Sequence, residues 1–199
     1  MKIEQYQQLY ASSPDWLKNA MDFSLITLQG LNEVVHAKFE HIDKDANTIK
    51  IIRKKTDKNE WAFLELEISP ELDAVIKRCR ADGIASPFLI HHRPKRRNPC
   101  KTKEHWSQIL PGYLGETLRD IRNELDTFTC MTKDKRPTFH EIRSLGSHLY
   151  DKAGFDKENY VQPLMAHADV EMTERYQSGH EIKWTRVRAD LRINDFIQN

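Results

Sequence analysis

The sequence lacks both a long apolar run and a closely spaced pair of cysteines. No segment approaches the roughly 18 consecutive apolar residues of a membrane-spanning helix, and the start, MKIEQYQQLY, has no apolar region typical of a signal peptide. The three cysteines, Cys79, Cys100 and Cys130, form no C-x-x-C pair, which argues against a disulfide framework and a structural zinc site. We therefore expect a soluble, cytoplasmic protein without a membrane partner.

The sequence also lacks an excess of charge of one sign. Lys and Arg number 31 against 30 Asp and Glu, so the formal net charge is +1, and this sum alone does not predict a nucleic-acid partner. No internal repeat or low-complexity linker divides the 199 residues, and 39 % of them are hydrophobic, enough for a folded core. One domain over residues 1–199 is the simplest organisation.

Hydrophobic periodicity predicts a mainly α fold with a small antiparallel β-sheet, which is an α+β class. Residues 47–53, rich in β-branched side chains, and the alternating residues 61–68 predict a hairpin with Lys55 at or near its tip. Serine or threonine caps, followed by proline or glutamate, mark several helix starts. Helices are expected at about residues 14–29, 32–40, 70–82, 117–125, 139–153, 158–165 and 170–176, with a tail helix at about 181–199.

Positive charge is concentrated in two connections. Residues 91–103, HHRPKRRNPCKTK, carry six Lys or Arg and no acid, a local charge of +6, and residues 133–136 read KDKR. Such segments suit DNA phosphates, although a solvated loop has the same composition.

The segment TFHEIRSL, residues 138–145, is the first candidate for a functional site. Thr138 and Glu141 form a capping-box pattern, so His140 and Arg143 fall on one face at the first turn of a helix. Helix N-termini favour anions and a guanidinium binds a phosphate through two donors, so a phosphate site is physically sensible. The alternative is a helix-start histidine with a surface arginine.

The segment LMAHADVEMTERYQSGH, residues 164–180, is the second candidate. His167 precedes a helical pattern that carries Tyr176, and a tyrosine hydroxyl is a nucleophile when its proton is accepted and its charge stabilised. Taken alone, a tyrosine at this spacing is equally typical of a helix core.

The two segments together resemble the C-terminal signature of the tyrosine recombinases, the phage integrase family. The order H-x-x-R-S-L, L-M-x-H and a tyrosine nine residues after that histidine carries the resemblance. The hairpin turn KKTDK looks like the family's lysine-bearing hairpin, and TLQGLNEVVHAKFEHID looks like its first box. The resemblance covers about residues 14–192 and implies the tyrosine recombinase fold, the catalytic fold of DNA breaking-rejoining enzymes.

The resemblance implies a role for each matching residue. Tyr176 would attack a DNA phosphodiester, giving a 3′-phosphotyrosyl link and a free 5′-hydroxyl, and Arg143 would bind the non-bridging oxygens. His140 and His167 would contact the same phosphate or accept the tyrosine proton, and Lys55 would protonate the leaving oxygen. This is phosphoryl transfer by positioning and charge stabilisation, for which no metal or cofactor is needed.

One position departs from the family's pattern. The first box carries an arginine with an acidic residue three positions later; here Glu33 matches the acid, but Gly30 stands at the arginine's place. Each lost donor of this type costs roughly 3–4 kcal/mol of transition-state stabilisation, so activity of this chain is in question. A substitution in this chain is the favoured explanation, ahead of a local shift of register or rescue by a nearby base such as Lys54.

The implied partner is double-stranded DNA, with a homotetramer on DNA and a monomer or weak oligomer without it. Family members carry DNA-binding domains before the catalytic domain, and this chain begins at the catalytic domain, so we expect a C-terminal catalytic part, a fragment or a truncated protein. The tail would pack either on a neighbouring protomer or on its own domain. The expected phosphate contacts from the two basic connections are Arg93, Lys95, Arg96, Arg97, Lys101, Lys135 and Arg136.

These residues lead to the hypothesis of a site-specific recombinase of prophage or genomic-island type, acting in DNA integration or excision. The first alternative is a DNA-binding and assembly module whose cleavage is impaired through Gly30. A type IB topoisomerase shares the chemistry but fits the L-M-x-H box less well. A metal nuclease built from His91, His92, Cys100 and His105 is the least favoured, because these residues lack a recognised ligand spacing and their surroundings are positive.

Overall fold

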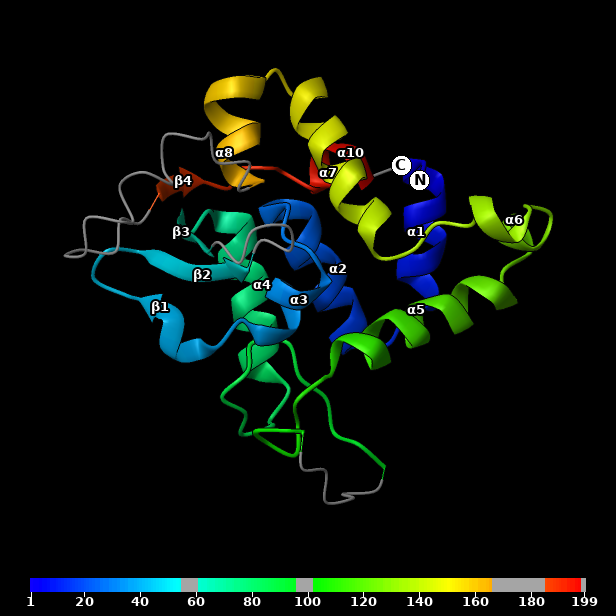
Figure 1. Ribbon diagram of the computed structural model, residues 1–199, viewed down its shortest axis with the longest axis horizontal. Coiled ribbons are helices and arrows are strands. Elements are labelled where there is room, and N and C mark those ends of the chain that lie inside the picture. Colours follow the sequence, from blue (N-terminus) through cyan, green and yellow to red (C-terminus); the bar gives the residue numbers. More distant parts are fainter. Residues whose placement is uncertain (55–60, 96–101, 166–184, 198–199) are drawn as a thin grey trace.

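A small sheet lies at one side of a group of helices in the computed structural model, which describes residues 1–54, 61–95, 102–165 and 185–197 (Figure 1). Its strands are β1 (Ile42–Asp43), β2 (Thr48–Lys54), β3 (Trp61–Glu67) and β4 (Thr185–Arg188), in the order β1-β2-β3-β4. β2 and β3 pair antiparallel, with Ile51 opposite Leu64, which confirms the predicted hairpin. β4 pairs with β3 in parallel, so the sheet is mixed and not purely antiparallel.

The helices agree with most of the predicted starts, although the helix predicted at 117–125 begins at Pro111, and the helix predicted at 170–176 lies outside the described residues. The Ser69 hydroxyl accepts a hydrogen bond from the amide of Leu72 at 3.3 Å and caps α4, as the sequence predicted. The first helix, with Tyr6 and Leu9 buried, was not expected from the periodicity. No helix among the described residues is long and apolar enough to cross a membrane. The helical elements are α1 (Ile3–Ser12), α2 (Asp15–Thr27), α3 (Leu31–His36), η1 (Phe39–His41), α4 (Pro70–Ala81), α5 (Pro111–Glu124), α6 (Asp126–Thr129), η2 (Lys133–Lys135), α7 (His140–Lys152), η3 (Lys157–Val161), α8 (Gln162–Leu164) and α10 (Asn194–Ile197).

Helix α2 forms the centre of the core. Its C-terminal half is buried on all sides, as expected for a helix covered by neighbours on every face. α7 packs directly against it, because Gly146 brings the two backbones so close that a Cβ there would lie 2.5 Å from the carbonyl oxygen of Leu25. The buried Tyr150 hydroxyl donates to the carbonyl of Ile26 at 2.6 Å and joins the same two helices. The first turn of α7 is therefore held in a fixed position against the end of α2.

The predicted tail helix at 181–199 is wrong for most of the described tail. Residues 185–188 form β4, and the tail is helical only in the short α10, which contacts α1, so the described tail ends beside the N-terminal helix (Figure 1). The alternation of buried Val187, Ala189 and Leu191 with polar neighbours has the period of a strand, not of a helix. The amide of Leu191 donates to the Tyr150 hydroxyl at 3.1 Å, so this part of the tail packs on its own chain.

Candidate active site

Arg143 projects from the first turn of α7 into the protein, with only 3 % of its surface exposed. The helix start is built as the capping pattern predicted: the Glu141 carboxylate accepts from both the amide and the hydroxyl of Thr138. Burial raises the pKa of Glu141, but these hydrogen bonds outweigh it, and the net pKa lies below its ordinary value. Local capping thus fixes the turn from which Arg143 extends.

Two guanidinium groups meet at one backbone carbonyl. Arg143 Nη2 donates to the carbonyl oxygen of Met165 at 2.6 Å, and Arg53 Nη1, from β2, donates to the same oxygen at 2.7 Å. Arg53 Nε lies 3.6 Å from Glu33 Oε1, a carboxylate from α3 that is itself almost fully buried. Burial and the charge of Arg53 lower the pKa of Arg143 to about 10, while Glu33 opposes the shift. We call Arg53, Arg143 and Glu33 the arginine cluster.

The first box lies against this cluster. Gly30 precedes α3 in an extended conformation, with φ −77° and ψ 174°, which any residue can adopt. A Cβ at Gly30 would lie 2.8 Å from Glu33 Oε2 and 4.0 Å from Arg143 Nη1. Gln29, just before it, donates to the carbonyl of Leu164 at 2.9 Å. Position 30 therefore adjoins Arg143 and Glu33, and Gln29 fixes the backbone just before Met165.

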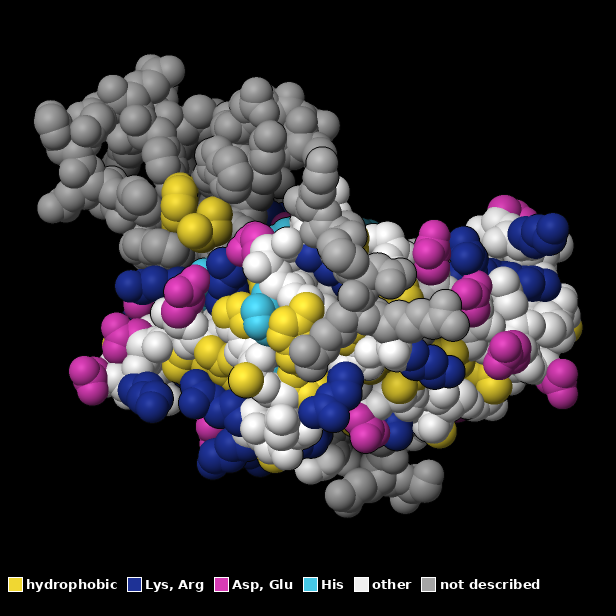
Figure 2. All heavy atoms as spheres, turned by 90° about the horizontal axis from the view of Figure 1, so that it is seen from below, with side chains coloured by type: hydrophobic (Ala, Val, Ile, Leu, Met, Phe, Trp, Pro, Cys, Tyr) yellow, Lys and Arg dark blue, Asp and Glu magenta, His cyan; other side chains and the backbone are white. Residues whose placement is uncertain are grey.

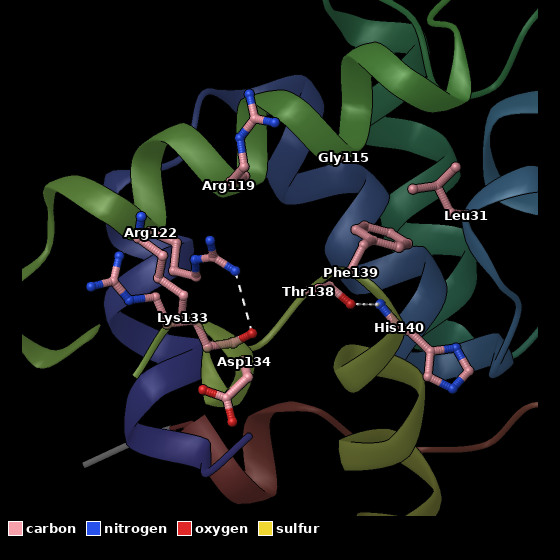
Figure 3. Close-up of a pocket in the computed structure, with 10 residues that line it drawn as sticks. Leu31, Gly115, Arg119, Arg122, Lys133, Asp134, Thr138, Phe139 and His140 are labelled. Carbon is pink, nitrogen blue, oxygen red and sulfur yellow. Dashed lines mark hydrogen bonds between the residues drawn. The ribbon is translucent and has the colours of Figure 1, made fainter. Parts of the chain in front are cut away.

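His140 lies on the surface, at one end of a cavity of about 520 Å³ (Figure 3). Arg119 and Arg122 reach this cavity from α5, and Lys133 and Arg136 also line it, so four cations and one acid, Asp134, stand on its otherwise largely apolar wall. The guanidinium of Arg122 donates to the carbonyl of Pro137 at 2.8 Å and so helps to hold the connection before α7. The cavity therefore offers cationic side chains to an anionic ligand beside His140. Arg143 does not line this cavity and lies in the buried arginine cluster.

Several predicted site residues lie outside the described residues. These are the proposed nucleophile, one histidine, the hairpin lysine and three basic loop residues, namely Tyr176, His167, Lys55, Arg96, Arg97 and Lys101. Met165 is the last described residue before 166–184, and its carbonyl accepts hydrogen bonds from Arg53 and Arg143.

The remaining basic residues fall into two kinds. Arg93, Lys95 and Lys135 are exposed and open to a partner. Arg136 is partly buried, and its three nitrogens bond to protein acceptors, among them the carbonyls of Met131 and Thr129, both at 3.1 Å. On the face in Figure 2, Lys and Arg side chains form separate groups with acidic side chains between them, in keeping with the balanced net charge.

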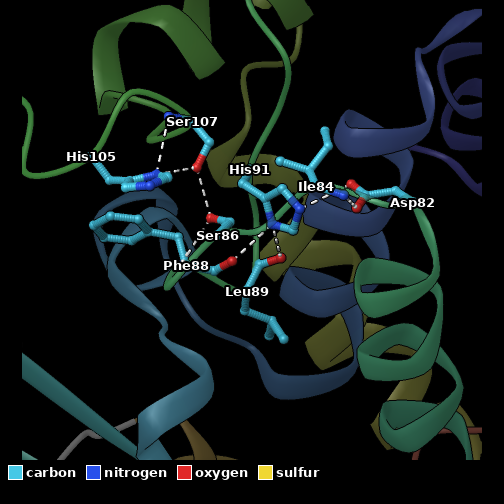
Figure 4. A network of polar contacts seen from close by, with 8 residues as sticks. All are labelled: Asp82, Ile84, Ser86, Phe88, Leu89, His91, His105 and Ser107. Carbon is cyan, nitrogen blue, oxygen red and sulfur yellow. Dashed lines mark hydrogen bonds and ion pairs between the residues drawn. The ribbon is translucent and has the colours of Figure 1, made fainter.

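The histidines of the metal-nuclease alternative are engaged in structural contacts (Figure 4). His91 is buried; its Nδ1 lies 2.8 Å from the carbonyl of Phe88, and its Nε2 lies 2.9 Å from the Asp82 carboxylate. His105 Nδ1 is 2.7 Å from the Ser107 hydroxyl, and His92 stacks on Tyr113. Within the described part of the chain, no group of three or more His, Cys, Asp or Glu side chains is placed to hold a metal, and Cys100 lies outside it.

Sequence reasoning missed Arg53. Lys54 is the base that the sequence offers as a possible rescue of the first box, behind the favoured explanation of a substitution, and its side chain is outside the described part. The missed signal was the strand period: Ile49 and Ile51 are buried on one face of β2, and Arg53 follows them at the same spacing of two. A cation on a core-facing position requires a partner, and here it has Glu33.

The Phage integrase family model matches residues 1–181. The chain belongs to the phage integrase family. It is 29 % identical over 175 residues to an integrase of Enterobacteria phage P21, covering 85 % of this chain and 42 % of that protein. It is 25 % identical over 201 residues to an integrase of Escherichia phage HK022, covering 96 % of this chain and 50 % of that protein. The chain thus spans about half the length of these curated relatives.

Solved structures agree with the family fold. The catalytic core of lambda integrase superposes with a TM-score of 0.65 at 17 % identity, covering 92 % of this chain and 95 % of that one. A lambda integrase tetramer bound to a Holliday junction superposes with a TM-score of 0.62 at 18 % identity, covering 85 % of this chain and 46 % of that one. The predicted tyrosine recombinase catalytic fold is confirmed.

Proposed function

We propose that this chain is the catalytic part of a site-specific DNA recombinase that cleaves DNA through Tyr176. The carrying observation is that the H-x-x-R and L-M-x-H segments meet in space: Arg143 from the first donates to the carbonyl of Met165 in the second. Two segments separated by two dozen residues thus contribute to one buried cationic site. The position of Gly30 beside Arg143 and Glu33 supports the alignment of the first box and disfavours a shift of register.

The proposed reaction is a phosphoryl transfer between DNA and protein. The Tyr176 oxygen forms a bond to phosphorus while the bond from phosphorus to the 5′-oxygen breaks. His167 or His140 accepts the tyrosine proton, and Lys55 supplies a proton to the leaving 5′-oxygen. Arg143 stabilises the negative charge on the non-bridging oxygens, which is the largest contribution expected of the described residues. Attack of a 5′-hydroxyl from another strand on the 3′-phosphotyrosyl link reverses the reaction.

Double-stranded DNA is the proposed partner. The basic cavity beside His140 and the exposed Arg93, Lys95 and Lys135 support phosphate contacts of the kind that hold DNA without reading its sequence. A homotetramer on DNA and a weaker assembly without it are proposed by analogy with the lambda integrase tetramer on a Holliday junction. The prophage or genomic-island setting is part of the same proposal.

A pool of nicked duplexes, randomised around the nick, tests the cleavage. The nick lets the short leaving strand diffuse away, so each cleavage leaves a covalent adduct that denaturing gel electrophoresis detects. We expect an adduct on the strand labelled upstream of the break, a free 5′-hydroxyl on the released strand, and no adduct for Tyr176→Phe.

The same assay separates the alternatives. Retention of the pool by the unaltered chain without any adduct would instead favour the impaired DNA-binding and assembly module. Strand cleavage that a chelator abolishes, with no covalent adduct, would favour the metal nuclease. An adduct that persists in Tyr176→Phe would exclude this tyrosine as the nucleophile.

A further inference from the structure

The arginine cluster contains more cations than the described residues around it balance. Arg53 and Arg143 share one carbonyl oxygen, and Glu33 is the carboxylate of the cluster, so the cluster carries one net positive charge. Two like charges at this separation repel each other, and the repulsion is strongest where water is excluded. Such an arrangement fits a site that a bound anion completes.

Arg143 also has a donor that nothing in the described chain uses. Its Nε is buried and finds no acceptor among the described residues. A buried N–H without a partner is costly, and in native proteins such a group commonly marks a catalytic role, an ordered water or a bound ion. The unused Nε and the charge excess are independent observations, and both indicate an oxyanion.

The two carboxylate oxygens of Glu33 face two different positions, residue 30 and Arg53. Its Oε2 faces Gly30, since a Cβ there would come within 2.8 Å of it. Its Oε1 instead pairs with Arg53, which reaches it from β2. A guanidinium therefore already occupies the neighbourhood of Glu33 and Arg143, although it comes from a different element.

We propose, on the basis of the recombinase function proposed above, that Arg53 is a phosphate-binding catalytic residue that replaces the arginine missing at Gly30. Arg53 and Arg143 together bind the non-bridging oxygens of the scissile phosphodiester, and Glu33 orients Arg53 through its Nε. Two guanidiniums supply paired, charge-assisted donors in the fixed geometry that phosphate oxygens accept. The cluster can thus retain a two-arginine phosphate site despite Gly30.

Titration with inorganic phosphate tests the site without any need for cleavage. The side-chain Nε–H resonance of Arg143 in a ¹⁵N spectrum reports binding at the cluster itself. We expect Arg53→Gln to weaken this binding by about tenfold, because charge-assisted hydrogen bonds are lost. Arg78→Gln is the matched control: Arg78 also bonds a carboxylate, but that of Asp22, and its loss should leave the titration unchanged.

Two results of the titration would overturn the proposal. One is phosphate binding by Arg53→Gln as tight as that of the unaltered chain. The other is equal weakening by Arg78→Gln, which would show a general charge effect. Thermal unfolding checks that each variant folds, and Arg53→Lys replaces Arg53→Gln if the latter does not.

Cleavage of the nicked pool tests the exchange of roles between positions 30 and 53. We expect Arg53→Gln to slow single-turnover adduct formation by about 10²-fold. Gly30→Arg should restore most of this rate in the Arg53→Gln background, because position 30 adjoins Arg143 and a Cβ there is crowded only by the far end of the Glu33 side chain. In the unaltered background, Gly30→Arg should change the rate by less than about tenfold, since the role is already filled.

A double variant no faster than Arg53→Gln, or a large gain from Gly30→Arg alone, would contradict the replacement of residue 30 by Arg53. The two proposals fail in different ways. An unaltered chain that forms no adduct contradicts cleavage by this chain, while the phosphate titration still decides the role of Arg53.

Discussion

Two clusters of charged side chains, each built around a buried group, are arranged in opposite ways in this protein. Around Asp22, on α2, the carboxylate accepts hydrogen bonds from the hydroxyls of Tyr6 and Tyr10, both at 2.9 Å, and pairs with Arg78. Each strong donor there has an acceptor, and one cation meets one anion. Among the described residues, the arginine cluster instead holds two cations for one carboxylate and leaves the Arg143 Nε without an acceptor.

This difference in charge balance and hydrogen bonding indicates a structural role for the Asp22 cluster and a ligand-binding role for the arginine cluster. A closed network of satisfied partners joins elements, and the Asp22 cluster joins α1, α2 and α4. An open network with surplus charge lowers stability unless a ligand completes it, so it persists where function requires it. The comparison therefore predicts that changes in the open cluster affect activity, whereas changes in the closed cluster affect stability.

The largest effect is expected from Arg143→Met. We expect adduct formation to slow by about 10³-fold, because the guanidinium proposed to stabilise the phosphate charge is removed. The free energy of unfolding at neutral pH should rise by about 1 kcal/mol, because the variant removes a buried cation that lacks a full set of partners. The folded-state pKa of about 10 lies below the ordinary 12.5, so this cost is full below pH 10 and fades as the pH rises above it.

Single-turnover cleavage and urea unfolding at two pH values measure both quantities for Arg143→Met. Loss of stability together with loss of cleavage would mean that Arg143 serves as a structural partner, and would remove the contrast between the two clusters.

The next effect is on stability alone. Asp22→Ala should lower the free energy of unfolding by about 3 kcal/mol, because the Tyr6 hydroxyl, fully buried, loses its acceptor and Arg78 loses its anion. Asp15→Ala, on the same helix but exposed, is the control and should change stability by about 0.5 kcal/mol or less. Urea unfolding measures both variants. A slower cleavage by folded Asp22→Ala would show that the two clusters are coupled.

The smallest effect concerns the capping carboxylate at the start of α7. Glu141→Gln should lower stability by about 0.5 kcal/mol, because Glu141 accepts the Thr138 donors as an anion. The folded pKa of Glu141 lies below the ordinary 4.5, so this stability is present above that pH and is lost as the pH falls through the folded value. Thermal unfolding at several acidic pH values measures the difference, and a difference that persists at the lowest pH would contradict this origin.

Much of the fold and part of the site were predictable from local patterns. The hairpin, the Ser69 cap of α4 and the capped start of α7 follow from residues close together in the chain. The tail prediction is wrong because the apolar spacings suggest a helix, whereas residues 185–191 alternate like a strand and residues 185–188 pair with β3, a strand far back in the chain. Local spacing alone does not say which partner a segment finds.

The order of H-x-x-R-S-L, L-M-x-H and a tyrosine in the sequence is enough to place the chain in the phage integrase family. A single helix turn sets the local pattern of His140, Arg143 and their capping residues. The contact of Arg53 with Met165 joins residues 112 positions apart, and no local pattern encodes it. Tertiary packing makes this contact: α7 packs on α2 and β2 lies beside α3, so side chains from distant segments meet at one carbonyl. The same packing places Gly30 against Glu33. Folding thus determines which residues share the proposed phosphate site, and the sequence determines the chemistry each can contribute.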